Sequence, residues 1–366
     1  MTTTIHVATR KGLFQVRREG GRWAVARVDF LGDNVTMVLP DGRDGAVYAA
    51  LAHGHFGVKL HRSDDGGATW AEASPPQFPP RPADADDVTA DGKPWPWRVE
   101  QVWSLEAGGG ARLWCGTLGG GLFTSDDRGA NWSLVRGLWD HPARRQWFGG
   151  GADHPAIHSI CVHPRDPDDV LVAVSCGGAW RTRDGGATWD VASRGMFAAF
   201  MPPERREDPV IQDPHRVAQC AARPERLWCQ HHNGVFRSDD RGGSWAEVKD
   251  VPPSVFGFAV AAHPRDPDAA WFVPAQKDER RVPVGGNVVV ARTRDGARSF
   301  EALREGLPQG HAYDIALRHA LDVGATGEVL AFGSTTGSLW VSDDGGDRWA
   351  HVSAHLPPVY AVRVAG

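Results

Sequence analysis

Residues 63–70 read SDDGGATW, and this pattern, S-x-D-x-G-x-T-W in general form, recurs along the chain. Close copies begin at Ser63, Ser125, Thr182, Ser238 and Ser342. A weaker copy spans residues 293–300, with Ala297 in place of a glycine and Phe300 in place of the tryptophan. A motif that recurs at a spacing of this size predicts one supersecondary unit that is used many times.

A further, degenerate copy lies near the N-terminus. Residues 12–16 align with residues 121–125 before the second box, and the segment ends at Gly20-Gly21-Arg22-Trp23, with Arg18 in place of the aspartate. The aromatic ends therefore fall at 23, 70, 132, 189, 245, 300 and 349, at intervals of 47 to 62 residues. This interval suits one four-stranded blade with its loops, so the sequence predicts an all-β fold, a single seven-bladed β-propeller.

Each box has a local physical purpose. The aspartate is expected to accept hydrogen bonds from backbone N–H groups of its own turn, and glycine allows the turn to be tight. The tryptophan opens the next strand and is expected to fill the core. The boxes are therefore interpreted as structural turns rather than as catalytic groups.

The two ends of the chain are predicted to share one blade. Residues 5–8 resemble a second strand, and residues 359–364 resemble a spare innermost strand. We expect blade 1 to combine residues 359–365 with 5–28, so that residues 1–366 form one propeller. Such pairing would remove open sheet edges.

Composition excludes several classes of protein. The net charge is −5 and no basic stripe is present, which argues against a nucleic-acid partner. The first residues lack the pattern of a signal peptide, and no apolar stretch is long enough to span a membrane. Five cysteines without metal-type spacing indicate reduced thiols, and a cytoplasmic location is expected.

Four long insertions map to one face of the predicted ring, opposite the boxes. They span residues 74–98, 137–155, 194–215 and 275–287, and the first three are rich in aromatic or methionine side chains. Long insertions in a compact domain are usually functional. We expect them to be lids over a pocket on the axis.

Histidines from different blades point to a metal. His53, His55, His231 and His232 lie in loops predicted near the axis on the lid side. Converging imidazoles suit a divalent transition metal (Zn, Mn, Fe, Ni or Cu), which polarises a bound group. An alternative is a metal-free site in which histidines and carboxylates act as acids and bases, and a third is inert polar loops. No organic cofactor is expected.

Other candidates lie at or before the inner strands. His158, His215, Asp314 and Glu100 are the predicted catalytic residues. Their types suit proton transfer to or from a polar substrate.

Substrate binding is assigned to a separate set. Arg10, Lys11 and Arg281 are placed to clamp an anionic group, and Trp147 to stack on a ring. For these residues a solvated charge run and packing within the lid are the respective alternatives.

The boxes resemble the Asp-box, or bacterial neuraminidase repeat, of sialidases, sortilin-type receptors and xyloglucanases. Along its whole length the chain resembles single-propeller bacterial proteins described as BNR-repeat or glycosyl-hydrolase-like, including segments 53–57, 230–234 and 332–337. The sialidase pattern is not met, because no Arg-Ile-Pro motif is present and the three tyrosines lack an evident glutamate partner. Xyloglucanases have two tandem propellers, whereas this chain has the length of one.

The leading functional prediction is an enzyme with a lidded axial pocket. It would act on a small polar or anionic substrate, sugar-derived or carboxylate-bearing, by metal-assisted or histidine-mediated hydrolysis or elimination. The first alternative is a glycoside hydrolase with paired carboxylates, Asp314 with Glu100 or Asp213. The second is a non-catalytic binding scaffold.

Overall fold

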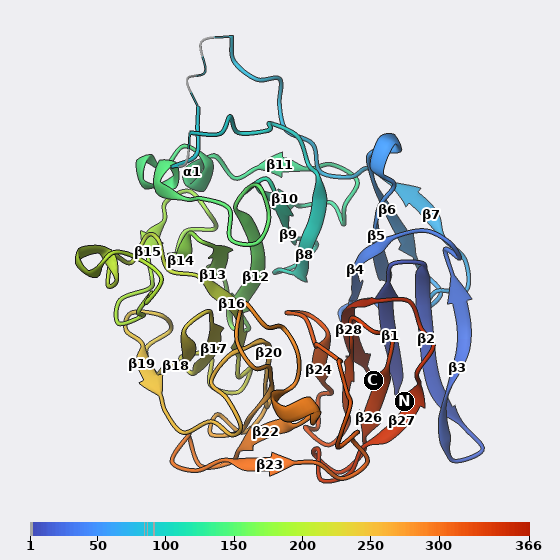
Figure 1. Ribbon diagram of the computed structural model, residues 1–366. Coiled ribbons are helices and arrows are strands. Elements are labelled where there is room, and N and C mark those ends of the chain that lie inside the picture. The colour runs from blue at the N-terminus through green and yellow to red at the C-terminus, as the bar shows by residue number, and fades with distance from the viewer. Residues whose placement is uncertain (1–2, 84, 86, 91) are drawn as a thin grey trace.

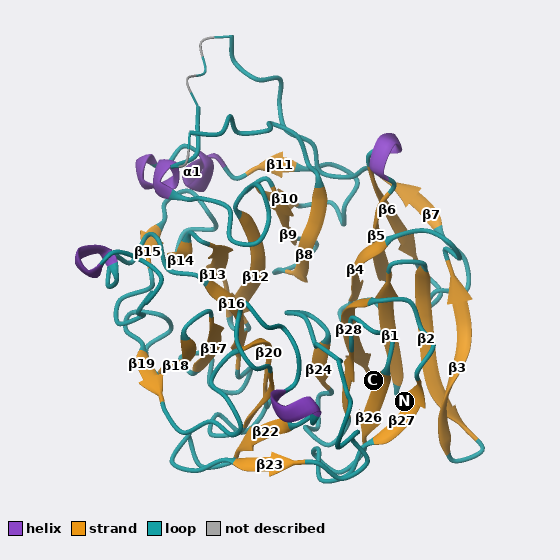
Figure 2. Ribbon diagram, viewed as in Figure 1, coloured by secondary structure: helices purple, strands orange, loops and turns teal. Residues whose placement is uncertain are grey.

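The computed structural model describes residues 3–83, 85, 87–90 and 92–366, and its regular structure is almost entirely antiparallel β-sheet (Figures 1 and 2). The described helices are single short turns: α1 Arg136–Trp139, η1 Gly54–Phe56, η2 Pro142–Gln146, η3 Pro203–Arg205 and η4 Val284–Gly286. Within the described residues, no helix has the length and apolar character needed to cross a membrane. The predicted all-β class is confirmed.

The strands pair in groups of four. The group that contains both chain ends runs β28-β1-β2-β3, with β28 Val359–Ala365, β1 Thr4–Thr9, β2 Gly12–Glu19 and β3 Arg22–Asp29. The next group in the chain is β4 Val35–Pro40, β5 Val47–Ala52, β6 Val58–Ser63 and β7 Ala71–Ala73. Both are the antiparallel meanders that consecutive strands with short turns favour.

An eight-stranded sheet follows. It joins β8 Gln101–Ala107, β9 Leu113–Leu118, β10 Leu122–Ser125 and β11 Ser133–Leu134 to β12 Ala156–His163, β13 Asp166–Ser175, β14 Gly178–Thr182 and β15 Asp190–Val191. The link between its two halves is a single residue pair, Leu118 with Ala156. The sheet is therefore two groups of four strands whose ladders are joined by one residue pair.

Three further groups complete the chain. They are β16 Pro214–Gln219, β17 Leu227–His231, β18 Gly234–Ser238 and β19 Ala246–Val248; β20 Gly257–Ala262, β21 Ala270–Pro274, β22 Val290–Thr293 and β23 Glu301–Leu303; and β24 Leu321–Val323, β25 Leu330–Gly333, β26 Leu339–Ser342 and β27 Ala350–Ser353.

The first strand of each group faces a common centre (Figure 1). Neighbouring inner strands touch in the order β28, β4, β8, β12, β16, β20 and β24, and β24 in turn touches β28. The contact between the two ends of the chain is a full antiparallel ladder, which runs from Thr4 opposite Ala365 to Thr9 opposite Val359. Both edges of these end strands are thereby paired or covered.

The box turns form the hydrogen bonds that the sequence predicts. In the copy at 63–70, the N–H of Thr69 donates to Asp65 Oδ1 (2.8 Å), and the Thr69 hydroxyl donates to Asp65 Oδ2 (2.7 Å). The N–H of Gly67 donates to Ser63 Oγ (2.7 Å). Gly67 has a φ of 93°, whereas Ala297 takes the corresponding place in the weaker copy at 70°. A side chain is unfavourable in this left-handed region, which explains the glycine preference.

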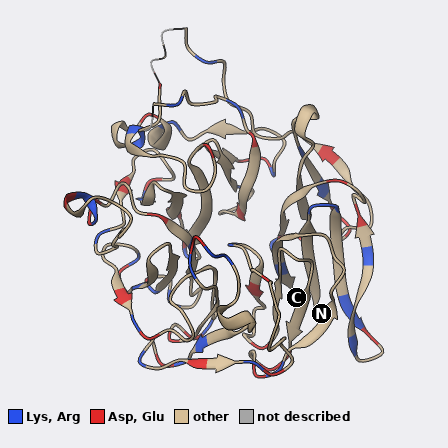
Figure 3. Ribbon diagram, viewed as in Figure 1, with Lys and Arg blue, Asp and Glu red and all other residues tan. Residues whose placement is uncertain are grey.

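Charged residues are spread over the chain, with both signs interspersed (Figure 3). The five cysteines are free and buried.

The sheets pack through large side chains such as Trp114, Trp180 and Trp228, all fully buried. Trp189, Trp245 and Trp349, which end their boxes, are 2–5% exposed, as expected for core-filling residues, whereas Trp70 and Trp132 are only partly buried against the core.

Candidate functional site

A cavity of about 610 Å³ lies at the centre, lined by inner strands and by loops of several sheets. Its wall consists of Gln101, Trp103, Leu118, Phe148, Gly149, Gly150, Gly151, Ala152, Cys176, Phe200, Asp213, His215, His232, Phe258, Asp278, Glu279, Arg281, Leu317, Arg318 and Tyr360. Eleven of these 20 residues come from three of the predicted lids, 137–155, 194–215 and 275–287. The wall combines several aromatic rings with a few charged groups, as is usual for a small-molecule site.

The inner strands bulge where they border this cavity. Trp103 on β8, His215 on β16, Phe258 on β20 and Tyr360 on β28 each fall at a register shift with the neighbouring strand. A bulge leaves a residue without a ladder partner and re-aims its side chain. All four of these residues line the cavity.

Asp213, His215 and His232 form a compact group of possible metal ligands, with their ligand atoms within 4.8 Å of one another. Asp213 Oδ2 lies 3.5 Å from His215 Nε2 and 3.3 Å from His232 Nδ1. Asp213 and His215 are 3% and 2% exposed, so these two members are buried in the wall of the cavity.

Hydrogen bonds hold each member of this group in place. Asp213 Oδ1 accepts from the N–H of Cys176 (3.1 Å) and from the Ser175 hydroxyl (3.2 Å). His215 Nδ1 lies 2.7 Å from the carbonyl oxygen of Gly257. Because a carbonyl only accepts, His215 Nδ1 carries the proton, and in the neutral ring the lone pair of Nε2 is directed towards Asp213. Such an anchoring bond on the far nitrogen is typical of metal-binding histidines.

Proton affinities in the group follow from burial and from the shared carboxylate. Burial opposes the charged form of Asp213, but its contacts with the His215 and His232 imidazoles hold its pKa well below the usual value. Burial lowers the pKa of His215 despite Asp213. Burial also acts against charged His232, yet the hydrogen bond with Asp213 outweighs it and the pKa of His232 is raised. The group thus keeps an ionised carboxylate beside two imidazoles.

Aromatic rings surround the imidazoles. Phe258 is stacked on His215, with ring centroids 4.6 Å apart. Phe200 meets His232 edge-on at 5.0 Å, and Phe256 lies 6.0 Å from the same ring. These rings exclude water and strengthen electrostatic interactions inside the site.

Of the four predicted metal ligands, only His232 lines the cavity. His231 lies behind the wall, where its ring nitrogens are each 3.1 Å from a backbone N–H, those of Asp213 and Asn233. Burial lowers the pKa of His231 to about 3. His231 therefore positions the Asp213 segment, and the N–H of His232 adds a second tie by donating to the Asp213 carbonyl (3.0 Å).

His53 and His55 lie on a different sheet, at η1 between β5 and β6. His53 Nδ1 is 3.9 Å from Asp33 Oδ1, and His55 packs edge-on against Phe56 at 5.5 Å. Within the described part of the chain, neither residue lines the cavity or joins the ligand group. The connection that carries them joins the second and third strands of its sheet, as the turn with His232 does, but it does not reach the cavity.

The predicted catalytic residues divide in the same way. His215 is in the ligand group. His158 is fully buried, with Nδ1 2.9 Å from Ser159 Oγ, and it is not part of the cavity wall as described. Asp314 accepts a hydrogen bond from the Ser334 hydroxyl (2.7 Å), and Glu100 pairs with Arg98 at 3.2 Å. Both carboxylates are held outside the described cavity wall by these loop contacts.

Of the predicted substrate-binding residues, the structure brings only Arg281 to the cavity, where its Nη2 lies 2.5 Å from Asp278 Oδ1. Arg10 and Lys11 are exposed in the turn between β1 and β2. Trp147 is fully buried and meets Trp95 and Trp180 edge-on. The tryptophans of the lids at 74–98 and 137–155 thus pack on each other rather than on a ligand; positions 84, 86 and 91 of the first lid lie outside the described residues.

Arg144 organises that tryptophan cluster. Its guanidinium lies 4.3 Å from the Trp95 ring centroid and 3.9 Å from that of Trp139, and it pairs with buried Asp87 at 2.8 Å. A buried charge that is paired and stacked in this way has its interactions satisfied within the protein and serves to hold the two lids together.

Arg318 and Trp103 belong to the cavity but were not predicted, and Asp213 was weighed only as a partner in a carboxylate pair. No motif or spacing in the sequence marks these residues. Trp103 lies on β8 and Arg318 just before β24, so their position on or beside an innermost strand brings them to the cavity.

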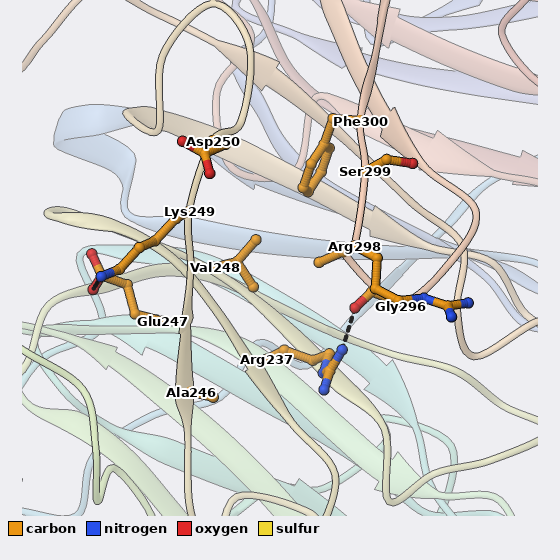
Figure 4. A pocket seen from close by; sticks show the side chains of 11 residues that line it. Arg237, Ala246, Glu247, Val248, Lys249, Asp250, Gly296, Arg298, Ser299 and Phe300 are labelled. Carbon is orange, nitrogen blue, oxygen red and sulfur yellow. Dashed lines mark hydrogen bonds and ion pairs between the residues drawn. The ribbon is translucent and has the colours of Figure 1, made fainter.

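A second hollow, of about 330 Å³, lies at the box of the sixth group (Figure 4). Its wall includes Arg237, which donates a hydrogen bond to the carbonyl of Gly296, and Ser299 and Phe300 of the box. The hollow is formed by box residues, by Arg237 of β18, and by β19 with Lys249 and Asp250 after it. It contains none of the predicted site residues.

Comparison with known proteins supports the assignment of the repeat. The family profile described as BNR-Asp box repeat matches residues 235–248, which span β18, a box and β19. No curated protein matches the chain. The chain carries BNR-Asp box repeats, as the motif predicted.

Solved structures resemble the fold at low sequence identity. One is an ancestral GH74 enzyme, with 15% identity and a TM-score of 0.59, covering 86% of this chain; this chain spans only 38% of that one. Another is YCF48 from Cyanidioschyzon merolae, with 12% identity, a TM-score of 0.53 and coverage of 88% and 87% of the two chains. A chain of the mitotic checkpoint complex has 12% identity, a TM-score of 0.54 and coverage of 93% and 83%. Similarity at this level of identity shows the fold alone.

Proposed function

We propose that this protein is an enzyme whose axial cavity binds a divalent transition metal on Asp213, His215 and His232 and acts on a small anionic substrate. The observation that carries the proposal is the convergence of three ligand atoms within 4.8 Å in the wall of a cavity of about 610 Å³. Because Nδ1 of His215 is hydrogen-bonded to Gly257, the lone pair of His215 Nε2 faces the carboxylate of Asp213. A cation bound between these two atoms would remove the electrostatic repulsion.

The ligand set fits zinc, iron or manganese. Two imidazoles and one carboxylate form the ligand set of many catalytic zinc centres and of non-haem iron centres. A bound metal would act as a Lewis acid that polarises a carbonyl or phosphoryl oxygen of the substrate. Hydrolysis or elimination are the reaction classes that this chemistry suits.

The chain itself would supply position and environment. Cys176 and Ser175 hold Asp213, and Gly257 holds His215. Cys176 takes a φ of 49°, unusual for a residue with a side chain, while it presents its N–H to the carboxylate. Backbone strain of this kind is concentrated at functional sites.

The proposal includes a closed, seven-bladed propeller with the cavity on its axis. Support for this part of the proposal comes from the seven groups of four strands, the cyclic order of inner-strand contacts and the ladder between β28 and β1. Blade 1 would then combine residues 359–365 with 5–28. The free buried thiols accord with the expected cytoplasmic location.

A metal titration tests the site. Protein made without a histidine tag should bind one equivalent of Zn²⁺ by isothermal titration calorimetry, and elemental analysis should find a stoichiometric metal. His232→Ala should weaken Zn²⁺ binding by about 100-fold or more, since even outer-shell changes cost 10- to 100-fold. His53→Ala is the matched control and should leave the affinity unchanged. Stoichiometric binding that survives in His232→Ala, or no binding by the natural protein, would refute the proposed centre.

Two carboxylate variants distinguish the glycoside hydrolase alternative. Cleavage of aryl glycosides that a chelator does not inhibit and that Asp314→Asn or Glu100→Gln abolishes would favour paired carboxylates over the metal. Neither of those carboxylates lines the cavity in the described residues, so we expect both variants to leave metal binding intact.

A further inference from the structure

Arg318 is a buried cation in the wall of the cavity. It precedes β24 and is 9% exposed. Its one hydrogen bond among the described residues is a long one, 3.5 Å from Nη2 to the Ser175 hydroxyl, and its Nε has no partner. A buried guanidinium with unused donors is costly unless a ligand satisfies it.

Other buried arginines show what is missing. Arg144, Arg226, Arg241 and Arg292 are 2–5% exposed, and each has a carboxylate oxygen within 2.5–2.9 Å. Arg318 has no such ion pair within the part of the chain that the structure describes. The four other buried arginines each have a carboxylate partner, and Arg318, which lines the cavity, is the exception among these five.

Two aromatic rings hold the guanidinium. Its central carbon lies 4.8 Å from the centroid of the Trp103 ring and 5.6 Å from that of Phe258. Stacking on rings leaves the edge of the guanidinium free to form paired hydrogen bonds, which suits a carboxylate. Trp103 and Phe258 both come from bulged positions, so the strands direct them towards the axis.

Phe258 also connects Arg318 to the proposed metal ligands. One of its neighbours is the guanidinium at 5.6 Å, and another is the stacked ring of His215 at 4.6 Å. A small molecule in the cavity would therefore meet a cation on one side and the Asp213 group on the other. The remaining wall includes the rings of Phe148, Phe200 and Tyr360, which suit an apolar or cyclic body.

We propose that Arg318 anchors the substrate through a carboxylate group, and that the substrate is a small carboxylic acid with an aromatic or cyclic body. The second charged arginine of the wall, Arg281, is already neutralised by Asp278 at 2.5 Å and does not compete for this role. The inference deepens the proposed function, because it names the substrate class of the same cavity. Recognition of the carboxylate by Arg318 does not itself require the metal.

Phenylacetate and its neutral analogue phenylacetamide are the probes. Binding to the full chain, freed of metal by a chelator, is measured by isothermal titration calorimetry. Phenylacetate should bind about 10- to 100-fold more tightly than phenylacetamide, the range expected for hydrogen bonds to a charged group. Arg318→Met should remove this preference, and Arg318→Lys should retain part of it.

Arg98→Met is the control for the loss of one positive charge. The Arg98 side chain is exposed and forms an ion pair with Glu100 instead of lining the cavity. This variant should preserve the preference, and circular dichroism should show that every variant is folded. No preference in the natural protein, an equal preference in Arg318→Met, or displacement of phenylacetate by an equal concentration of inorganic phosphate would overturn the assignment. Zn²⁺ binding measured in parallel separates the two proposals, since the metal group can be present in a protein that lacks carboxylate selectivity.

Discussion

The box turns and the axial cavity use similar polar residues in opposite ways. In the box at 182–189, Asp184 accepts from the backbone and hydroxyl of Thr188 and from Thr182, so its hydrogen bonds are closed within a few residues. In the cavity, Asp213 faces His215, two residues later on β16, and His232 in the turn after β17, while Arg318 has no carboxylate partner among the described residues.

This difference separates structure from function. A polar group whose partners lie in its own turn stabilises that turn and has nothing left to offer a ligand. A buried polar group that lacks a partner, or an acceptor that faces another acceptor, indicates that a ligand supplies the missing interaction. The repeated motif was the clearest feature of the sequence, yet the residues of greatest functional interest are those that occur once.

Deleting residues 359–366 should have the largest effect, because the cavity depends on contacts between distant segments. Val359 and Val362 of β28 are fully buried, and burying a valine contributes about 1.5–3 kcal/mol. The deletion should therefore cost at least about 3–6 kcal/mol from these two side chains, a large share of the 5–15 kcal/mol typical of a domain. Thermal unfolding followed by circular dichroism measures the loss, and Val362→Ala should give a smaller decrease. An unchanged melting temperature in the deletion variant would argue against a ring closed by β28.

Changing one box carboxylate should have an intermediate effect with a defined dependence on pH. Hydrogen bonds from Thr188 and Thr182 lower the pKa of Asp184 to about 2, below the unfolded value of about 3.9. A lowered pKa stabilises the fold at pH values above the unfolded pKa, and this contribution disappears as the pH falls through the folded pKa. The natural protein should therefore exceed Asp184→Asn in unfolding free energy at pH 6, and the gap should close as the pH approaches 2.

Urea unfolding at a series of pH values measures that gap. Asp190→Asn is a suitable control, because Asp190 is exposed and pairs only loosely with Arg183 at 3.3 Å. Zn²⁺ binding should be equal in Asp184→Asn and the natural protein, since the box takes no part in the cavity. A gap that is constant with pH would show that the Asp184 charge does not contribute.

The smallest expected effect comes from restoring the glycine of the weaker box. Ala297 has a φ of 70°, in the left-handed region where a side chain is costly by roughly 1–2 kcal/mol. Glycine removes that strain but makes the unfolded chain more flexible, at a cost of about 0.4–1 kcal/mol. Ala297→Gly should therefore stabilise the protein by about 0.5 kcal/mol, measurable by urea unfolding. Gly67→Ala, at the matching position of the first box, should destabilise it, because the added carbon would lie 2.1 Å from Gln15 Nε2. Destabilisation by Ala297→Gly would contradict this account.

Several features of the protein follow from the sequence alone. The spacing of the boxes is a local property, and the hydrogen bonds that stabilise each turn lie within eight residues, so both the all-β class and the box geometry were predictable. Pairing of the two chain ends was predictable for the same reason, since it follows from counting strands between boxes. The lid positions indicated which face carries the cavity.

Only the tertiary structure decides which polar residues meet at the axis. His231 and His232 are adjacent in the sequence, yet one ring is turned into the wall to hold the backbone of Asp213 while the other faces the cavity. His53 and His55 resembled them by position but lie between β5 and β6 of another sheet, away from the cavity. The choice rests on bulges, on the ring-to-ring packing around Phe258 and on where a carboxylate happens to lie, and these are long-range properties that no local pattern encodes.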